Sequence, residues 1–170
     1  FIQRIMVPKG EIEAEQLYRI GELAELYADG FVYSTNRQNL ELHGIEPDKR
    51  QTVRSQLQEN GLLADGFFGV RDIVSCVGTT YCPLAVTRTH DMFDALNELV
   101  QEEKYAPIAD KILINITGCP NSCAQYYMSD IGMRGCRIRE ESGSVEGYEI
   151  RIGGTQTYFG EVLGDFKFDD

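Results

Sequence analysis

Four of the five cysteines in this chain of 170 residues form two close pairs, and the pairs narrow the possible folds more than any other part of the sequence. Five residues separate Cys76 from Cys82, and three separate Cys119 from Cys123. A chain of this length that is 42% hydrophobic can bury a core without disulfides, so the pairs need another explanation. Four thiolates from two loops suit an iron-sulfur cube, which takes one cysteine per iron. The spacing therefore predicts a redox centre between the two loops.

Zinc, disulfides and buried free thiols are the competing interpretations of the two pairs. Structural zinc sites usually separate paired ligands by about two to four residues, which Cys76 and Cys82 do not fit. Two disulfides would conflict with a reducing compartment, which we expect for this chain. Cys136 stands apart from both pairs and is interpreted as a small buried hydrophobe. His43 is expected to pack or hydrogen-bond locally beside Gly44.

The charge and the ends of the chain restrict its partners and setting. A formal net charge of -11 with scattered Lys and Arg argues against a nucleic-acid surface. The sequence shows no secretory signal, lipidation motif or long apolar run, so we expect a cytoplasmic protein that does not enter a membrane. It begins at Phe1 and ends at Asp170. These ends lead us to expect a fragment, a processed subunit or an excised domain.

Helical and strand patterns alternate along the chain, which predicts an α+β fold. An opening strand-helix-strand-helix unit places a boundary near residue 65, with domains at 1–65 and 66–170. The expected strands cover 2–7, 31–34, 39–43, 72–75, 111–117, 131–137 and 148–152. The expected helices cover 13–28, 47–60, 83–103 and 120–129.

Several segments carry a resemblance to a known family. They are Cys76-Val-Gly-Thr-Thr-Tyr-Cys82, Thr117-Gly-Cys-Pro-Asn-Ser-Cys123-Ala-Gln, Ser34-Thr35-Asn36-Arg37-Gln38-Asn39-Leu40 and His43-Gly44-Ile45. Together they resemble the sirohaem-dependent nitrite and sulfite reductases. The likeness spans nearly the whole chain, and its cysteine motif is the most specific part.

The resemblance implies a ferredoxin-like half domain over 1–65 and an α/β sirohaem and 4Fe-4S binding domain over 66–170. It also implies that Cys76, Cys82, Cys119 and Cys123 ligate a 4Fe-4S cluster, with Cys123 shared between cluster and sirohaem. Enzymes of this family reduce sulfite to sulfide or nitrite to ammonia with six electrons. Arg37, Gln38 and Asn121 lie in segments that approach the macrocycle, whose carboxylates call for cationic and amide donors.

The resemblance also implies a cage of cations around an anionic substrate. Arg4, Arg71 and Lys111 fall at cation positions of the family, whereas Leu113 occupies the position of a further lysine or an asparagine. Because of that departure, the sequence does not decide between sulfite and nitrite as the substrate. The three cations could instead face haem carboxylates or solvent.

Full-length members of this family enclose one sirohaem between two homologous halves, and this chain resembles the cluster-bearing half. We therefore expect a complementary half-domain or a homodimer, and an electron donor such as ferredoxin or a flavoprotein. Two other functions stay open: a non-catalytic iron-sulfur electron-transfer module and a zinc-stabilised interaction domain.

Overall fold

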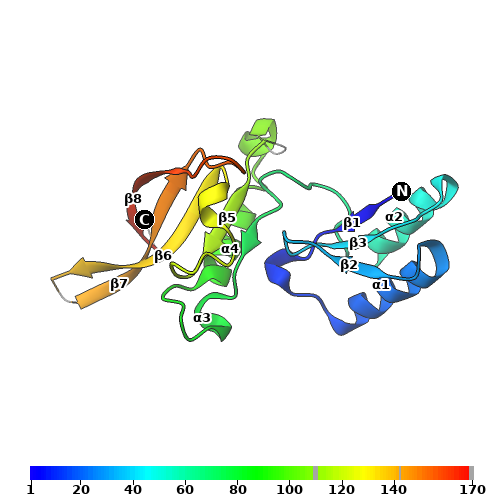
Figure 1. The fold of residues 1–170 in the computed structure, drawn as a ribbon, viewed down its shortest axis with the longest axis horizontal. Helices are drawn as coiled ribbons and strands as arrows, with labels where there is room; N and C mark the ends of the chain where they lie inside the picture. Colours follow the sequence, from blue (N-terminus) through cyan, green and yellow to red (C-terminus); the bar gives the residue numbers. More distant parts are fainter. Residues whose placement is uncertain (109–110, 142, 169–170) are drawn as a thin grey trace. The chain divides into compact units, whose positions relative to one another are not determined.

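The computed structural model describes residues 1–108, 111–141 and 143–168. The chain divides into two compact units, Phe1–Phe67 and Phe68–Asp170, which are described separately (Figure 1). Both units combine helices with a sheet, so the expected α+β class is confirmed. Within the part of the chain that the structure describes, no helix has the length and apolar character needed to span a bilayer.

The first unit packs two helices on one antiparallel sheet. Its elements are β1 (Gln3–Ile5), α1 (Ala14–Tyr27), β2 (Val32–Ser34), β3 (Leu40–Leu42) and α2 (Arg50–Glu59), with short 3-10 helices at Pro8–Gly10 and Pro47–Lys49. The strand order is β1-β3-β2. Ile5 and Leu42 share one sheet face because side chains alternate along a strand, and both join the helices in a single core. That core contains Ile5, Ile20, Leu23, Ala24, Leu42, Ile45, Val53, Leu57, Leu62 and Ala64.

Helix α1 illustrates how the sequence determines a local element. The Glu13 side chain and the Gln16 side chain form a reciprocal capping box, which satisfies backbone donors of the first turn. Ile20, Leu23 and Ala24 then recur at helical spacing and are buried. The helix expected over 13–28 is confirmed within one residue at each end.

The second unit is built on a mixed sheet in the order β4-β5-β6-β7-β8. Its strands are β4 (Val74–Ser75), β5 (Ile114–Thr117), β6 (Ile131–Glu140), β7 (Gly143–Ile152) and β8 (Glu161–Lys167). The pairs β4-β5 and β5-β6 are parallel, whereas β6-β7 and β7-β8 are antiparallel. Helix α3 (Gly78–Tyr81) follows β4, and helix α4 (Thr89–Leu99) packs on β4 and β5 (Figure 1). The core contains Val70, Ile73, Phe93, Val100, Ile114, Ile116, Met133 and Tyr148.

One expected helix in this unit is shorter than predicted, and another is wrong. The helix expected over 83–103 begins only at Thr89, because the preceding segment bonds to neighbouring backbone instead of to itself. The Val86 N–H donates to the Gly118 carbonyl (2.8 Å), and the Thr79 N–H donates to the Thr87 carbonyl (3.1 Å). The helix expected over 120–129 is reduced to a 3-10 turn at Tyr126–Met128, which follows a left-handed Gln125 (φ 52°).

Candidate metal centre

The two cysteine pairs lie on loops that leave neighbouring parallel strands. Cys76 directly follows β4, and Cys119 lies two residues beyond the end of β5. Ser75 on β4 is in register with Ile116 on β5, and the Cys76 N–H donates to the Ile116 carbonyl (3.0 Å). Because the carboxyl ends of parallel strands meet at one edge of a sheet, the two loops begin side by side.

Gly118 joins the two loops directly. Its backbone N–H donates to the Sγ atom of Cys76 (3.1 Å), and its carbonyl accepts from the Val86 N–H (2.8 Å). A Cβ atom added at Gly118 would lie 3.0 Å from the Ala85 Cβ and 3.2 Å from the Gly78 Cα. The first loop therefore approaches so closely that a side chain before Cys119 would press against Ala85 and Gly78.

A single helical turn returns the first loop to Cys82. Helix α3 separates Cys76 from Cys82, and the Cys82 N–H donates to the Gly78 carbonyl (3.0 Å). Gly78 has a φ of +55°, and a Cβ atom there would lie 2.3 Å from the Thr89 Oγ1. The Thr89 hydroxyl in turn donates to the Cys76 carbonyl (2.5 Å). The start of α4 thus contacts this loop at Cys76 and at Gly78.

The second loop folds back on the end of β5. The Ala124 N–H donates to the Thr117 Oγ1 (3.3 Å), and Ser122 adopts a left-handed φ of 57°. This path leaves Cys119 buried and Cys123 exposed, whereas Cys76 and Cys82 are partly buried. All five cysteines are free thiols. The exposed position of Cys123 leaves its sulfur accessible to a second group.

The residues of these loops suit an iron-sulfur cluster. They combine four free cysteine sulfurs with a backbone N–H directed at one of them, which is the donor set that such clusters use. Ser122, between Cys119 and Cys123, has a buried Oγ without a hydrogen-bond partner among the described residues. A polar atom in that state fits a loop that contacts a bound group.

The ligating side chains in the described part of the chain do not form a site for a single ion. Among residues 1–108, 111–141 and 143–168, no three His, Cys, Asp or Glu side chains lie close enough together to hold one metal ion. A tetrahedral zinc site requires ligands that converge on one point, whereas a 4Fe-4S cluster takes one cysteine at each iron.

Cys136 lies on β6, outside both cysteine loops, and pairs with Gly147 on β7. It is partly buried, and burial, followed by the negative charge of Asp165, raises the pKa of its thiol. A thiol with a raised pKa is a poor nucleophile and a poor metal ligand at neutral pH. Cys136 therefore provides a matched control for substitutions of the paired cysteines.

The basic residues predicted to act at the site are distributed over both units. Arg4 lies on β1 and donates from Nη2 and Nε to the Glu41 Oε1 at 2.5 and 2.8 Å. In the second unit, Arg71 and Lys111 are exposed and precede β4 and β5, at the strand ends opposite the cysteine loops. The structure therefore does not bring Arg71 and Lys111 to the sulfur atoms, and their contact with substrate stays a prediction.

The residues predicted to contact a macrocycle show varied environments. Asn121 is exposed in the loop between Cys119 and Cys123. Arg37 is partly buried, and its backbone N–H donates to the Thr35 Oγ1 (3.3 Å). Gln38 has a φ of 61° and lines a pocket of about 470 Å³ with Thr35 and Asn39. The polar turn that contains Arg37 and Gln38 thus borders a cavity in the first unit.

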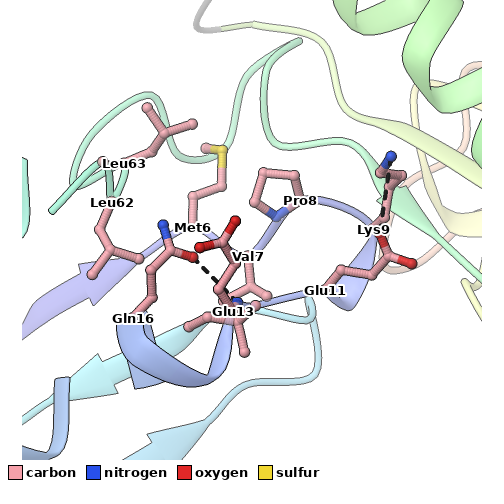
Figure 2. A pocket seen from close by; sticks show the side chains of 11 residues that line it. Met6, Val7, Pro8, Lys9, Glu11, Glu13, Gln16, Leu62 and Leu63 are labelled. Carbon is pink, nitrogen blue, oxygen red and sulfur yellow. Dashed lines mark hydrogen bonds and ion pairs between the residues drawn. The ribbon is translucent and has the colours of Figure 1, made fainter. Parts of the chain in front are cut away.

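A second pocket of about 420 Å³ in the first unit contains none of the predicted site residues. Figure 2 shows apolar Met6, Leu62 and Leu63 along one part of its lining, with Lys9 and Glu11 at another. Its wall is set by the bridge between Met6 and Leu63, whose N–H···O distance is 2.8 Å.

Several residues that shape the metal centre were not identified from the sequence. Gly78, Thr89 and Gly118 fix the cysteine loops through backbone approach and hydrogen bonds. The glycines fall within or beside the cysteine motifs, so their position was a usable signal. The sequence gave no such signal for Thr89, because Thr89 lies in a segment that was expected to be the middle of a helix.

Comparison with known families accounts for most of the chain. Residues 1–60 match the nitrite/sulfite reductase ferredoxin-like half domain, and residues 68–158 match the nitrite and sulphite reductase 4Fe-4S domain. The second match includes all four paired cysteines.

The chain is similar to longer proteins. It is 33% identical to ferredoxin--nitrite reductase of Synechococcus elongatus, over 89% of this chain and 29% of that protein. It is 30% identical to sulfite reductase [ferredoxin] 2 of Mycolicibacterium paratuberculosis, over 93% of this chain and 30% of that protein. The chain therefore spans less than a third of the length of these relatives.

Solved structures show the same fold. The NirA protein of Mycobacterium tuberculosis superimposes with a TM-score of 0.83 at 25% identity, over 99% of this chain and 32% of that one. Dissimilatory sulfite reductase I gives a TM-score of 0.76 at 16% identity, which shows similarity of fold alone.

Proposed function

Because the chain belongs to the nitrite and sulphite reductase family, we propose that it is the cluster-bearing half of a sirohaem-dependent reductase of nitrite or sulfite. The observation that carries the proposal is the contact between the two cysteine loops. Cys76 and Cys119 leave adjacent strand ends, and the Gly118 N–H bonds the Cys76 sulfur. This arrangement allows four thiolates to surround one 4Fe-4S cluster.

Cys76, Cys82, Cys119 and Cys123 are the proposed ligands, and Cys123 is the proposed ligand shared with sirohaem. Its exposure supports that role, because a shared sulfur must reach a second group outside its own loop. When bound, the coupled cofactors would pass six electrons from an external donor to nitrite or sulfite, which gives ammonia or sulfide. Asn121, in the same loop, is a proposed amide donor to a sirohaem carboxylate.

We propose that the first unit helps to bind and orient the sirohaem and the anionic substrate. Gln38 lines a pocket of the first unit, Arg37 precedes it in the same turn, and both are the proposed contacts to the carboxylates of the macrocycle. Arg4 is held on the sheet face by Glu41, which fixes its direction and offsets its charge. Arg4, Arg71 and Lys111 remain proposed contacts to an anionic substrate, with protons drawn from solvent through such cations.

The proposal extends to partners. Relatives named ferredoxin--nitrite reductase and sulfite reductase [ferredoxin] support ferredoxin as the electron donor, with a flavoprotein as the other candidate. Since the chain spans 29% of the first of these relatives, a complementary half-domain or a second copy of this chain is proposed to complete the sirohaem pocket.

Anaerobic reconstitution with iron and sulfide tests the proposed ligands. We expect the full chain to bind iron and acid-labile sulfide in equal amounts and to give the visible and electron paramagnetic resonance spectra of a 4Fe-4S cluster. Cys123→Ser should lose the spectrum or convert it to that of a smaller cluster, whereas Cys136→Ser should retain it. Colourless protein that contains stoichiometric zinc would refute the proposal.

A second observation favours a non-catalytic electron-transfer module as the alternative. Arg71 and Lys111 lie at the strand ends opposite the cysteine loops, and Leu113 replaces a polar residue of the family. Addition of sirohaem, reduced viologen and either nitrite or sulfite distinguishes the two functions. A sirohaem absorption band together with turnover would support the reductase and identify its substrate. A cluster spectrum with neither a sirohaem band nor turnover would support the electron-transfer module. Sedimentation of the sirohaem-loaded protein tests assembly, since a monomer holding full sirohaem would exclude the proposed dimer.

A further inference from the structure

The residues that lead into α4 hold the first cysteine loop from one side. The Thr87 carbonyl accepts the Thr79 N–H (3.1 Å), and the Thr89 hydroxyl donates to the Cys76 carbonyl (2.5 Å). A Cβ atom added at Gly78 would lie 2.7 Å from the Thr89 backbone nitrogen and 2.9 Å from the Thr87 carbonyl oxygen. Because backbone lies against backbone there, the loop cannot keep its place if the segment before α4 shifts.

Glu146 on β7 fixes the residue between these two threonines. Its Oε2 atom accepts from the backbone N–H of Arg88 (3.2 Å) and from the Arg88 Nε (3.1 Å). One carboxylate oxygen thus bonds both the main chain and the side chain of Arg88. Glu146 lies on the sheet face on which the core packs, because side chains alternate along β7 and Tyr148, two residues later, lies in that core.

The Glu146 carboxylate also caps α4 from outside the helix. Arg88 is the residue before the first turn, and its own side chain makes no capping hydrogen bond. The first N–H groups of a helix lack partners within the helix, and negative charge is favourable near them. A carboxylate from β7 therefore satisfies a donor at this end and holds the start of α4 against the sheet.

Arg88 extends the connection to the segment that follows β8. Its guanidinium lies over the ring of Phe168, 4.6 Å from the ring centre, and the Phe168 N–H donates to the Glu146 carbonyl (3.2 Å). The Arg88 side chain is 51% exposed, so solvent screens its attraction to the Glu146 carboxylate. The hydrogen bond from the Arg88 backbone is therefore the contact that matters most for the position of the chain.

We propose that Glu146 and Arg88 form a clamp that positions the first cysteine loop, and with it Cys76 and Cys82, for binding of the cluster. The clamp consists of the two hydrogen bonds from Arg88 to the Glu146 carboxylate. The inference rests on the proposed function, since it assigns the clamp to proposed ligands of that cluster. Both are positioning residues that act on the loop through the neighbouring threonines.

The reactivity of the thiols in the full chain without added iron tests this inference. Alkylation by iodoacetamide, followed at each cysteine by mass spectrometry, reports how often the loop opens. We expect Glu146→Ala to accelerate alkylation of Cys76 by about threefold to tenfold, because it removes both bonds of the clamp, and to leave Cys136 unchanged. Glu140→Ala is the matched control. It removes a carboxylate from β6, the strand paired with β7, where Glu140 forms an ion pair with Lys167, and it should change neither rate.

A second variant separates positioning from general loss of stability. Arg88→Ala keeps the backbone N–H and removes only the side-chain bond, so it should accelerate alkylation of Cys76 less than Glu146→Ala does. In the double variant the acceleration should be smaller than the product of the two single effects, because both act through one carboxylate. Urea unfolding measures the stability of each variant, and Arg88→Ala serves where Glu146→Ala does not fold. Equal acceleration at Cys76 and Cys136, or none at Cys76 in either variant, would overturn the inference.

Reconstituted protein connects the clamp to the cluster. We expect Glu146→Ala to release bound iron to a chelator faster than wild type and faster than Glu140→Ala. Release at the wild-type rate would overturn the role of the clamp at the cluster. If wild-type protein binds no iron and sulfide, the proposed function fails, and the alkylation rates then still decide whether the clamp positions the loop.

Discussion

At the scale of single residues, Glu41 organises the exposed face of the sheet in the first unit. Its Oε1 accepts from Arg4, and its Oε2 lies 3.0 Å from the Nε2 of His43. The ring of Tyr33 stacks on His43 with a centroid distance of 4.1 Å, and the Tyr33 hydroxyl donates to Asp29 (2.8 Å). The hydrogen bond to His43 and then the bonds from Arg4 lower the pKa of Glu41, even though burial opposes this effect. One carboxylate thus fixes both a predicted substrate cation and a histidine.

Glu41→Gln should destabilise the first unit in a pH-dependent way. Because the pKa of Glu41 is lower in the folded state, its carboxylate stabilises the fold above the ordinary pKa of 4.5, and this stabilisation is lost as pH falls through the folded pKa. We expect a loss of roughly 1–3 kcal/mol at neutral pH that shrinks toward zero in acid. Urea unfolding at neutral and acidic pH measures both values. The control Glu22→Gln removes an exposed ion pair with Arg19 and should cost far less than Glu41→Gln, because solvent screens that pair. Equal costs for the two variants at every pH would contradict the expectation.

The site residues differ in how far the sequence could predict them. Cys76, Cys82, Cys119 and Cys123 follow from their spacing, because few centres accept four thiolates from two short motifs. Thr89 could not be predicted, because its hydrogen bond to the Cys76 carbonyl joins the start of α4 to a residue 13 positions earlier in the chain. The acidic partner of His43 was also missed, although strand alternation places residues 41 and 43 on one face.

At the scale of elements, close backbone approach determines where glycine is required. A Cβ atom at Gly132 on β6 would lie 1.8 Å from the Tyr126 carbonyl oxygen, which is backbone and cannot rotate away. Gly21 on α1 has no atom within 4 Å of the corresponding position. A glycine-to-alanine substitution is therefore expected to have opposite effects on stability in β6 and in α1.

Gly132→Ala should destabilise the second unit by at least about 1–3 kcal/mol, because the 3-10 turn at Tyr126–Met128 must move away from β6. Gly21→Ala should stabilise the first unit by about 0.5–1 kcal/mol, because alanine favours the helix interior. Thermal unfolding of both variants and of the wild-type protein measures these changes in stability. A neutral Gly132→Ala would show that the turn does not pack on the strand as described.

Local sequence patterns predicted the elements that local contacts stabilise. They failed where hydrogen bonds to distant backbone determine the conformation. Helix α1 carries its own capping box and apolar stripe, so its bounds could be predicted closely. The segment before α4 bonds to Gly118 and to Thr79 instead, and no local pattern encodes those partners. Strand β8 was not expected, because most of its side chains are exposed and it lacks the alternation of a half-buried strand.

At the scale of the whole molecule, the two units have separate hydrophobic cores. The first contains residues from Ile5 to Ala64, and the second contains residues from Val70 to Tyr148. Leu57 and Ile116 are fully buried, one in each core. Each unit therefore has the apolar interior that a cooperative folding unit needs.

Leu57→Ala and Ile116→Ala should act on different units. Each leaves a cavity that costs about 2–5 kcal/mol. We expect Leu57→Ala to accelerate amide hydrogen exchange within Phe1–Phe67 and to leave the second unit near wild type, with the converse for Ile116→Ala. Hydrogen exchange read by mass spectrometry on peptides from both units provides the measurement. Faster exchange in both units after either substitution would show that they unfold together.

The hydrogen bonds that join the cysteine loops come entirely from the polypeptide: Cys76 to Ile116, Gly118 to Cys76 and Val86 to Gly118. Two of these three bonds join backbone groups alone, so replacing a cysteine by serine leaves both of them available. We therefore expect a serine variant that no longer binds the cluster to retain the adjacency of the two strand ends.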